Sequence, residues 1–447
     1  MSRLSPLAAA LLLTACAGAA TPTPSPTTDT GSTARRQDTE QTDALGPGSR
    51  RATEQELRII AELVGAAERI RSLRLRTSVP VVVEDPSAIR RYIARQLKEE
   101  DLQRARSIYV ALGMLSPDLD VRGMLLRVMG EQIMGYYDPR ARRLVIRDSV
   151  MRAFAGGGPE VELQGARSVI VHELVHALQD QHLGLGEVID LDRTSDADTA
   201  LRALVEGDAN LAMLAGDGGG AVGALRRLTR DSARMRELSQ LVLQPPPPDS
   251  ELGRAPPIVR VPLLFAYSEG LVFAAQLHGG GGWGAVDAAH ARPPVSTQQI
   301  LHPEHYAEGR LPLQLPPPGL PALEAAGYMS LPEDTLGELE LRIFLRASGA
   351  TEPEAEMVAG HWTGDSVRVH TGPDGQLGAL WMIAFDAPAA ADQAAALVEQ
   401  AHRQLPAAAR AAAAIRRGGD RLLIARGLPQ RFHGALGSLL DPAGGAH

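Results

Sequence analysis

The chain has little of several features that commonly define a protein class. It contains a single cysteine, Cys16, in 447 residues, so no disulfide bond can form within the chain. Its net charge is −8 and its basic residues are scattered, so we expect no nucleic-acid partner. After residue 16 no apolar run reaches the length of a bilayer span, and we expect no transmembrane helix there.

Residues 1–16 have the features of an export signal, because a positively charged start precedes an apolar run, 7–13, that is too short for a stable membrane span. The ending Leu13-Thr-Ala-Cys16 resembles the bacterial lipobox. The resemblance implies cleavage before Cys16 and its lipidation, and hence an exported lipoprotein of the cell envelope. Ala17 favours the periplasmic face of an outer membrane over the outer face of the cytoplasmic membrane, by family analogy. The alternative is a plain signal peptide.

The composition divides the rest of the chain into four stretches. Residues 17–52 are rich in Thr, Pro, Ser, Gly and Asp, so we expect a disordered tether. Residues 53–314 are predicted to form a mostly helical core with a small upstream β-hairpin. A Pro-rich linker, 315–332, then leads to a smaller α+β domain at 333–442. The expected fold class is therefore α+β.

One apolar stretch, Ser168-Val-Ile-Val-His172-Glu173-Leu-Val-His176-Ala-Leu, contains the pattern H-E-x-x-H. Residues i and i+4 share a face of a helix, so His172 and His176 can present two imidazoles to one metal ion. Glu173 is then placed to take a proton from water bound to that ion. The competing interpretation is an amphipathic helix with two ordinary histidines on its polar edge.

This motif resembles that of the zincin metallopeptidases, in which the two histidines bind Zn²⁺ and the glutamate is the general base. The resemblance implies a Zn²⁺ cofactor and a peptide or protein substrate. Downstream, Ala203-Leu-Val-Glu206-Gly-Asp208-Ala-Asn210 resembles the second helix of the gluzincins, which implies Glu206 as the third ligand. Asn210 stands where thermolysin-like enzymes carry an Asp that orients a ligand histidine. Asp208 would lie on a different face of the helix.

His182 is the rival third ligand, because its spacing from the first histidine also matches the ligand spacing of the metzincins. Metzincins carry Gly where this chain has Gln179, since their backbone turns sharply there. With Gln179 we expect the helix to continue and to end near Gly184, which favours Glu206. Asp180 and water are further options, and His182 would otherwise cap the helix C-terminus.

Periodicity and turn residues predict the elements around this motif. Residues 133–147 are predicted to form a hairpin with a Pro turn. In zincins an edge strand above the active-site helix binds extended substrate, so this hairpin is a candidate for that role; an ordinary structural hairpin is the alternative. A strand is expected at 79–83, the motif helix is expected to begin near Glu160, and further helices are expected at 53–76, 86–112, 121–134, 199–214, 221–243 and 263–278.

Residues 183–200 are expected to form a solvated acidic loop. Calcium binding is the alternative, although the spacing of the carboxylates fits no known calcium loop. The acidic residues are Asp190, Asp192, Asp196 and Asp198.

The segment 263–306, together with 135–139 and 176–182, resembles a group of bacterial lipoproteins that contain the HExxH motif. Zincin hydrolysis develops an oxyanion at the scissile carbonyl, and a Tyr or His from a later segment donates a hydrogen bond to it. The side chains suited to this role are Tyr267, His302 and Tyr306. The alternative for each of these residues is a purely structural role.

The C-terminal domain is predicted to contain strands at 366–370, 379–385 and 421–425, with a helix at 389–403 and a strand or helix at 336–347. It carries no catalytic cluster, so we expect it to pack against the core, to dock substrate or to gate the cleft.

The expected function is that of a membrane-tethered zinc-dependent peptidase with Glu173 as the general base. Two alternatives belong to other classes. One is a catalytically inactive, zincin-like binding lipoprotein of the cell envelope. The other is a structural envelope protein in which the motif is accidental.

Overall fold

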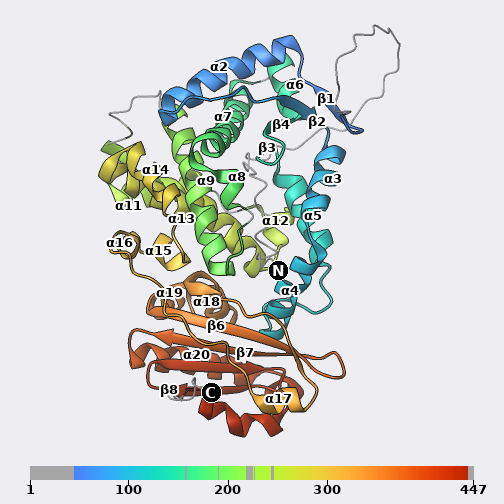
Figure 1. Ribbon diagram of the computed structural model, residues 1–447, viewed down its shortest axis with the longest axis vertical. Helices are drawn as coiled ribbons and strands as arrows, with labels where there is room; N and C mark the ends of the chain where they lie inside the picture. The colour runs from blue at the N-terminus through green and yellow to red at the C-terminus, as the bar shows by residue number, and fades with distance from the viewer. Residues whose placement is uncertain are drawn as a thin grey trace.

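The structure is a computed structural model, and it describes residues 45–156, 159–189, 191–217, 225, 227–242 and 246–440. A helical region carries a small sheet at one end, and a larger sheet forms the opposite end of the molecule (Figure 1). The predicted α+β class, with a mostly helical core and small β elements, is confirmed. The expected signal with Cys16 and the tether up to residue 44 lie outside the described residues.

The helical region begins with α2, whose first turn is closed by a capping box between Thr53 and Glu56. The expected long helix over 86–112 is in fact two helices, because the chain leaves helical geometry around Leu97 and restarts at an acidic first turn. The helices before the motif are α2 Glu54–Arg71, α3 Pro86–Gln96, α4 Glu99–Ala111, α5 Val121–Gln132 and α6 Asp148–Gly156.

The small sheet has the strand order β1-β2-β4-β3, and the predicted hairpin is its β3–β4 pair. The strands are β1 Ser49–Arg51, β2 Val81–Glu84, β3 Gly135–Asp138 and β4 Arg143–Arg147. The β2–β4 pairing is parallel and the other two are antiparallel. The disordered tether was expected to extend to residue 52, and this C-terminal boundary is wrong. Ser49–Arg51 forms an edge strand through backbone pairing that needs no apolar side chains.

The motif lies on α7, Glu160–Leu183, which begins at the expected residue and ends at Gly184 in the left-handed conformation. It packs against α9, Ser195–Asp217, and α9 packs along α13, Pro257–Gly281. Among the described residues, this region also contains α8 Leu185–Val188, α11 Ser232–Val242, α12 Glu251–Arg254, α14 Trp283–Ala291, α15 Thr297–Leu301 and α16 Pro303–Ala307.

The predicted solvated acidic loop is wrong for two of its four carboxylates. Asp196 and Asp198 lie in the first turn of α9 and are each 1% exposed. Asp198 is paired with Arg202, and Asp196 accepts hydrogen bonds from Thr297. Asp192 is exposed as expected, and Asp190 lies outside the described residues. Arg202 compensates the charge of Asp198, whereas Asp196 is buried with Thr297 as an uncharged donor.

The larger sheet is antiparallel throughout, with the order β5-β6-β7-β9-β8. Its strands are β5 Met329–Ser330, β6 Trp362–Thr371, β7 Leu377–Phe385, β8 Ala414–Gly418 and β9 Arg421–Arg426. The accompanying helices are α17 Pro321–Ala325, α18 Gly337–Ala347, α19 Glu352–Ala359, α20 Pro388–Gln404, α21 Ala407–Ala411 and the 3-10 helix η1 Gln430–Leu440. The expectation that 315–332 is a linker outside the C-terminal domain is wrong, because this stretch contains α17 and strand β5, which pairs with β6.

Alternate residues of β7 face two different cores. Trp381 joins a large cluster that also contains Tyr109 of α4 and Phe344 of α18. Leu380 and Met382 point to the other face, where α17 and η1 cover the sheet. The inner face of the larger sheet therefore shares one hydrophobic core with the helical region.

Helix α13 corrects the expectation that no later apolar run reaches membrane-span length. In the part of the chain that the structure describes, it is the one helix long and apolar enough to cross a membrane, with a mean hydropathy of 1.5 over its most apolar window. Of that window, 56% is buried within the protein. A helix in the core of a soluble protein has the same properties, so length and composition are weak support for a membrane span.

Candidate metal centre

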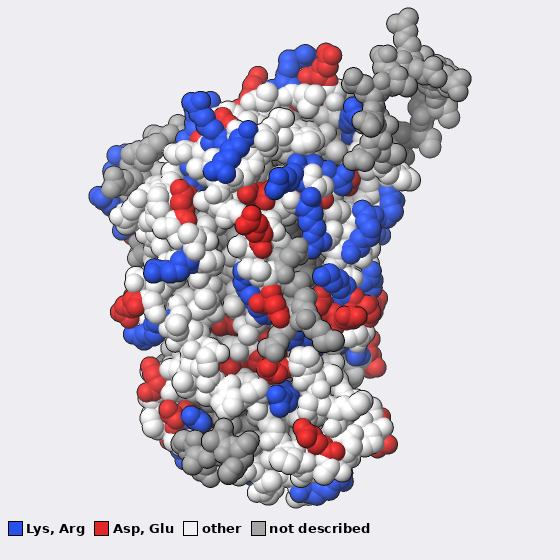
Figure 2. Space-filling model, viewed as in Figure 1, with Lys and Arg blue, Asp and Glu red and all other residues white. Residues whose placement is uncertain are grey.

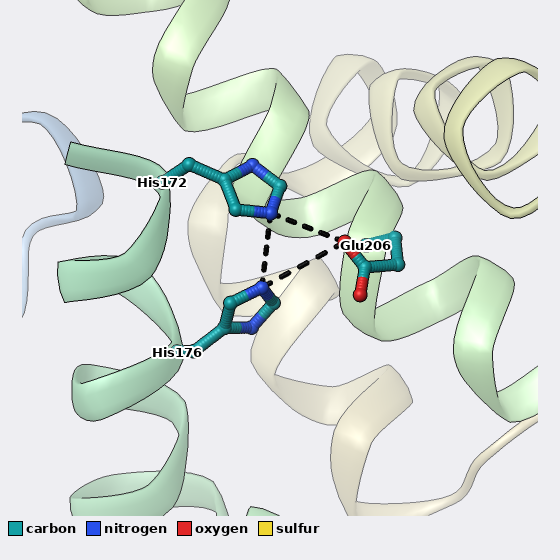
Figure 3. Close-up of side chains that lie close together, drawn as sticks. All are labelled: His172, His176 and Glu206. Atoms are coloured by element: carbon teal, nitrogen blue, oxygen red, sulfur yellow. Dashed lines mark hydrogen bonds and ion pairs between the residues drawn. The ribbon is translucent and has the colours of Figure 1, made fainter. Parts of the chain in front are cut away.

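Three donor side chains from two helices converge in the interior of the helical region (Figure 3). His172 and His176 lie one turn apart on α7, and Glu206 faces them from α9. The two histidine Nε2 atoms are 3.0 Å apart. Glu206 Oε2 lies 3.1 Å from Nε2 of His172 and 3.7 Å from Nε2 of His176. All three side chains are buried, and together they can hold a metal ion.

The spacing of the donor atoms suits a small tetrahedral ion. Bonds of about 2.0–2.1 Å to a tetrahedral centre place the donor atoms roughly 3.3 Å from one another. The three observed separations, 3.0, 3.1 and 3.7 Å, bracket that value. Two imidazoles and one carboxylate are also a donor set that Zn²⁺ accepts. The residues present therefore fit zinc.

The electrostatics of the three side chains are coupled. Burial lowers the pKa of His172. Burial opposes the charged form of His176 as well, but the Glu206 carboxylate outweighs it and raises the pKa of His176 to about 9. Burial likewise opposes the charged form of Glu206, while His176 and His172 lower its pKa to about 2. Glu206 is thus held as a carboxylate, the form that binds metal.

Glu173 is fully buried on α7 and directly follows His172 in the sequence. Its Oε2 accepts a hydrogen bond of 2.9 Å from the backbone N–H of Tyr137 in β3. The same strand makes a second contact with α7, because the Tyr137 hydroxyl donates to Asp180 at 2.8 Å. The predicted hairpin thus lies directly against the motif helix and fixes the Glu173 carboxylate.

The alternative third ligands lie elsewhere. His182 Nε2 is 2.5 Å from the backbone carbonyl oxygen of Arg74, and it does not belong to the donor cluster. Asp180 accepts from Tyr137 and from the backbone N–H of Gly186. The geometry therefore brings Glu206, and neither of these two residues, to the histidines.

Of the three candidate oxyanion donors, Tyr267 is the one that the structure brings to the donor cluster. Its ring lies 6.3 Å from the His172 ring, and the two planes are 25° apart. His302 contacts Glu338 at 3.1 Å, and the Tyr306 hydroxyl donates to the backbone carbonyl of Arg292. Both therefore have structural partners away from the cluster.

A close crossing of α9 and α13 sets the positions of Glu206 and Tyr267. A Cβ atom at Gly207 would lie 2.0 Å from the carbonyl oxygen of Gly270, and one at Gly270 would lie 2.2 Å from that of Ala203. Only glycine permits this approach of two helix backbones. Asn210, one turn after Glu206, donates to the backbone carbonyl of Tyr267 at 3.4 Å.

Sequence reasoning missed the buried polar residues behind His176. Its Nδ1 lies 2.7 Å from Gln179, and Gln179 contacts Asp208, which is paired with Arg71 and His290. The motif spacing itself gave no signal for Arg71, which lies 137 residues before Asp208 and is fully buried. The H-E-x-x-H-x-x-Q spacing did place Gln179 one turn from His176, and that was the available signal.

Comparison with known proteins adds one match. The model of a domain of unknown function, DUF8575, matches residues 328–435. This region runs from just before β5 into η1 and does not include the donor cluster. No curated protein and no solved structure matches the chain.

Proposed function

We propose that this protein is a zinc-dependent peptidase of the zincin type. The observation that carries the proposal is the convergence of His172, His176 and Glu206 with zinc-compatible spacing, on a helix whose Glu173 is fixed by a neighbouring strand. The zincin resemblance of the motif supports the same conclusion, with Glu206 as the third ligand in the manner of the gluzincins.

The proposed chemistry divides between the ion and the chain. Zinc, when bound, would lower the pKa of a water molecule and polarise the scissile carbonyl. Glu173 takes the proton of the attacking water and passes it to the leaving amine. Its carboxylate is held for this by the Tyr137 N–H, so it needs no rearrangement between the two transfers. Tyr267 is the proposed donor to the oxyanion, because it lies beside His172.

The proposed substrate is an extended peptide or protein segment added to the edge of β3. The Arg147 N–H donates to the Met134 carbonyl, so every second residue from Met134 onward forms backbone hydrogen bonds with β4. The residues between them, Gly135 and Tyr137, therefore direct their backbone N–H and C=O groups away from β4. The Tyr137 N–H is used by Glu173. The outward groups that remain, the Gly135 N–H and the carbonyls of Gly135 and Tyr137, lie on a buried strand, so pairing with a substrate strand requires this edge to become exposed when substrate binds.

The proposed location is the bacterial cell envelope, with the chain anchored through lipidated Cys16. The lipobox-like ending at Cys16 supports this part of the proposal. On the viewed face, acidic and basic side chains are intermixed (Figure 2).

The test begins with the zinc content of the full-length chain beside its His176→Ala and Glu206→Ala variants. We expect about one zinc per chain in the unaltered protein and loss of tight binding in both variants. Hydrolysis of a denatured protein is then compared with that by Glu173→Gln. We expect this variant to retain zinc and to lose a factor of about 10²–10⁴ or more in rate.

Each other outcome has a definite meaning. Absence of zinc after reconstitution would contradict the metal site and leave a structural envelope protein with an accidental motif. Bound zinc without hydrolysis would contradict the peptidase and favour an inactive binding lipoprotein. Full activity in Glu173→Gln would contradict the role of Glu173.

A further inference from the structure

Gln179 connects a proposed zinc ligand to a buried ion pair. Its side-chain oxygen Oε1 lies 2.7 Å from Nδ1 of His176. Its amide nitrogen donates to the backbone carbonyl of Val205 at 3.0 Å and to Asp208 Oδ2 at 2.9 Å. Gln179 is fully buried, so these contacts have no competition from solvent.

These contacts determine the orientation of the Gln179 side-chain amide, that is, which partners its oxygen and its NH₂ group face. A backbone carbonyl and a carboxylate are both acceptors, so both must face the NH₂ group. The oxygen therefore faces His176, and Nδ1 of His176 must carry the proton that Gln179 accepts. With Nδ1 committed to Gln179, Nε2 is the nitrogen that faces His172 and Glu206, and it becomes available to a metal ion when it loses its proton. The amide thus selects the metal-binding tautomer of His176.

Asp208 is held in turn by two cationic or donor groups from distant parts of the chain. Arg71 of α2 donates to it through Nε at 2.7 Å and through a terminal nitrogen at 3.2 Å. Nε2 of His290 lies 3.0 Å from the same carboxylate. Arg71 also pairs with Asp287 and lies over the Trp283 ring. The carboxylate that orients Gln179 therefore cannot rotate freely.

We propose that Gln179, held by Asp208 and Arg71, is a positioning residue that fixes the tautomer and orientation of His176 for zinc binding. The inference rests on the proposed zinc site. It assigns the support of His176 to a residue on α7, one turn after that histidine. Asn210 interacts with the other proposed ligand histidine, His172, and also donates to the Tyr267 backbone. Hydrogen-bonded partners of ligand histidines typically change metal affinity by about 10–100-fold when removed.

The test compares zinc affinity, by competition with a chelator, in the full-length protein and two matched variants. Gln179→Leu removes the acceptor for His176 at similar volume. Gln181→Leu is the control, because Gln181 lies two residues on in the same helix and its side chain bonds to the backbone of Arg76 and Thr77, away from His176. We expect about 10–100-fold weaker zinc binding in Gln179→Leu and less than about twofold change in Gln181→Leu.

Two further measurements separate positioning from folding. Gln179→Glu, whose protonated carboxyl can still accept from His176 and donate to Asp208, should recover most of the affinity lost in Gln179→Leu. In the unaltered protein loaded with Co²⁺, paramagnetic proton NMR should show the His176 Nδ1–H as a shifted signal protected from solvent exchange. That signal tests the tautomer even if Gln179→Leu does not fold.

The outcomes keep the two proposals apart. Zinc binding by the unaltered chain with equal affinity in Gln179→Leu would overturn this inference and leave the proposed function standing. A His176 that binds cobalt through Nδ1 would overturn it as well. Absence of metal binding in the unaltered chain would overturn the proposed function, and this inference with it.

Discussion

Helix α9 passes through two buried polar clusters that shift the pKa of a carboxylate in opposite directions. In its middle, Glu206 faces His172 and His176, and the pKa of Glu206 falls to about 2 because of these histidines, although burial opposes it. At its N-terminus, Asp196 lies among the carboxylates of α18 and β6, and burial raises its pKa to about 8. One helix therefore carries a carboxylate kept charged and another kept neutral.

The partners explain the difference. At the N-terminal cluster the hydrogen bonds to Asp334 and Asp365 come from uncharged donors, and the Arg104 guanidinium lies 3.9 Å from Asp334. Asp334 accepts from the backbone N–H and hydroxyl of Ser195, and Asp365 accepts from two backbone N–H groups and the indoles of Trp362 and Trp381. In the middle, Asp208 faces Arg71, and Glu206 faces His176, whose pKa is raised to about 9. Uncharged donors orient a carboxylate but do not offset the free-energy cost of removing its charge from water, so its pKa rises. A cation offsets that cost and keeps the carboxylate ionised.

The comparison also gives the C-terminal region a structural role. Asp334 and the Thr335 carbonyl receive the first two N–H groups of α9, those of Ser195 and Asp196. These contacts come from the region that matches the domain of unknown function. The N-terminal end of the helix that carries Glu206 is thus held by this region, and the middle of the helix by Arg71 and Gln179.

We expect the largest effect from a substitution that breaks the ion pair between Arg71 and Asp208. Arg71→Met leaves Asp208 buried without its main counter-charge, so we expect the free energy of unfolding to fall by about 3–5 kcal/mol. Urea unfolding of the protein in chelator measures it without a contribution from metal. The double variant Arg71→Met with Asp208→Asn removes the stranded charge and should be less destabilised than the single variant. A single variant within about 1 kcal/mol of the unaltered protein would contradict the assignment.

The matching change at the other cluster is Asp365→Asn. One oxygen becomes an NH₂ group that faces two N–H donors, so two buried hydrogen bonds are lost. We expect a loss of on the order of 3 kcal/mol in the free energy of unfolding. Because Trp362 and Trp381 donate to the two different oxygens, near-ultraviolet circular dichroism should also change. An unchanged unfolding curve would show that these donors are satisfied without the carboxylate.

The pH dependence sharpens the comparison further. The pKa of Asp196 rises from 3.8 in the unfolded chain to about 8, so between these values the folded state binds a proton that the unfolded state has released. Stability should therefore be highest near the lower value and fall as pH rises through the upper one. The slope from this group is up to about 1.4 kcal/mol per pH unit.

The variant Asp196→Asn isolates that contribution. Asn cannot ionise, and its oxygen can still accept from Thr297. We therefore expect a smaller loss of stability between about pH 5 and about pH 8 in this variant than in the unaltered protein, both measured in chelator. Parallel pH profiles for the two proteins would contradict a neutral Asp196 in the folded state.

What the sequence predicted at the candidate metal centre rests on local spacing. The i, i+4 separation of His172 and His176 sufficed to place both on one face of α7, and Gln179 correctly indicated that the helix would continue. The periodicity predicted a helix over 199–214 that contains Glu206, and Asp138-Pro139 indicated the hairpin turn. Each of these signals lies within a few residues of the feature that it predicts.

What the sequence did not predict depends on partners far along the chain. Arg71 and Asp208 are joined across 137 residues, and no local pattern announces the pair. Asp196 was assigned to a solvated loop because an unpaired carboxylate avoids the interior, and its partner Thr297 is 101 residues away. Ser49–Arg51 joined a sheet through its backbone alone, which composition does not reveal.

The smallest expected effect concerns His182, and it separates the two ligand sets that the sequence left in competition. Because α7 continues through Gln179, His182 is carried away from the donor cluster to the Arg74 carbonyl. We therefore expect His182→Ala to change zinc affinity by less than about twofold and to cost about 1 kcal/mol or less in stability, the contribution of one hydrogen bond. Competition with a chelator, run beside Glu206→Ala, measures both variants on one scale. Strong loss of zinc in His182→Ala with binding retained in Glu206→Ala would move the third ligand to His182. That result would require α7 to unwind at Gln179, because only a turn of the backbone there brings His182 to the other two histidines.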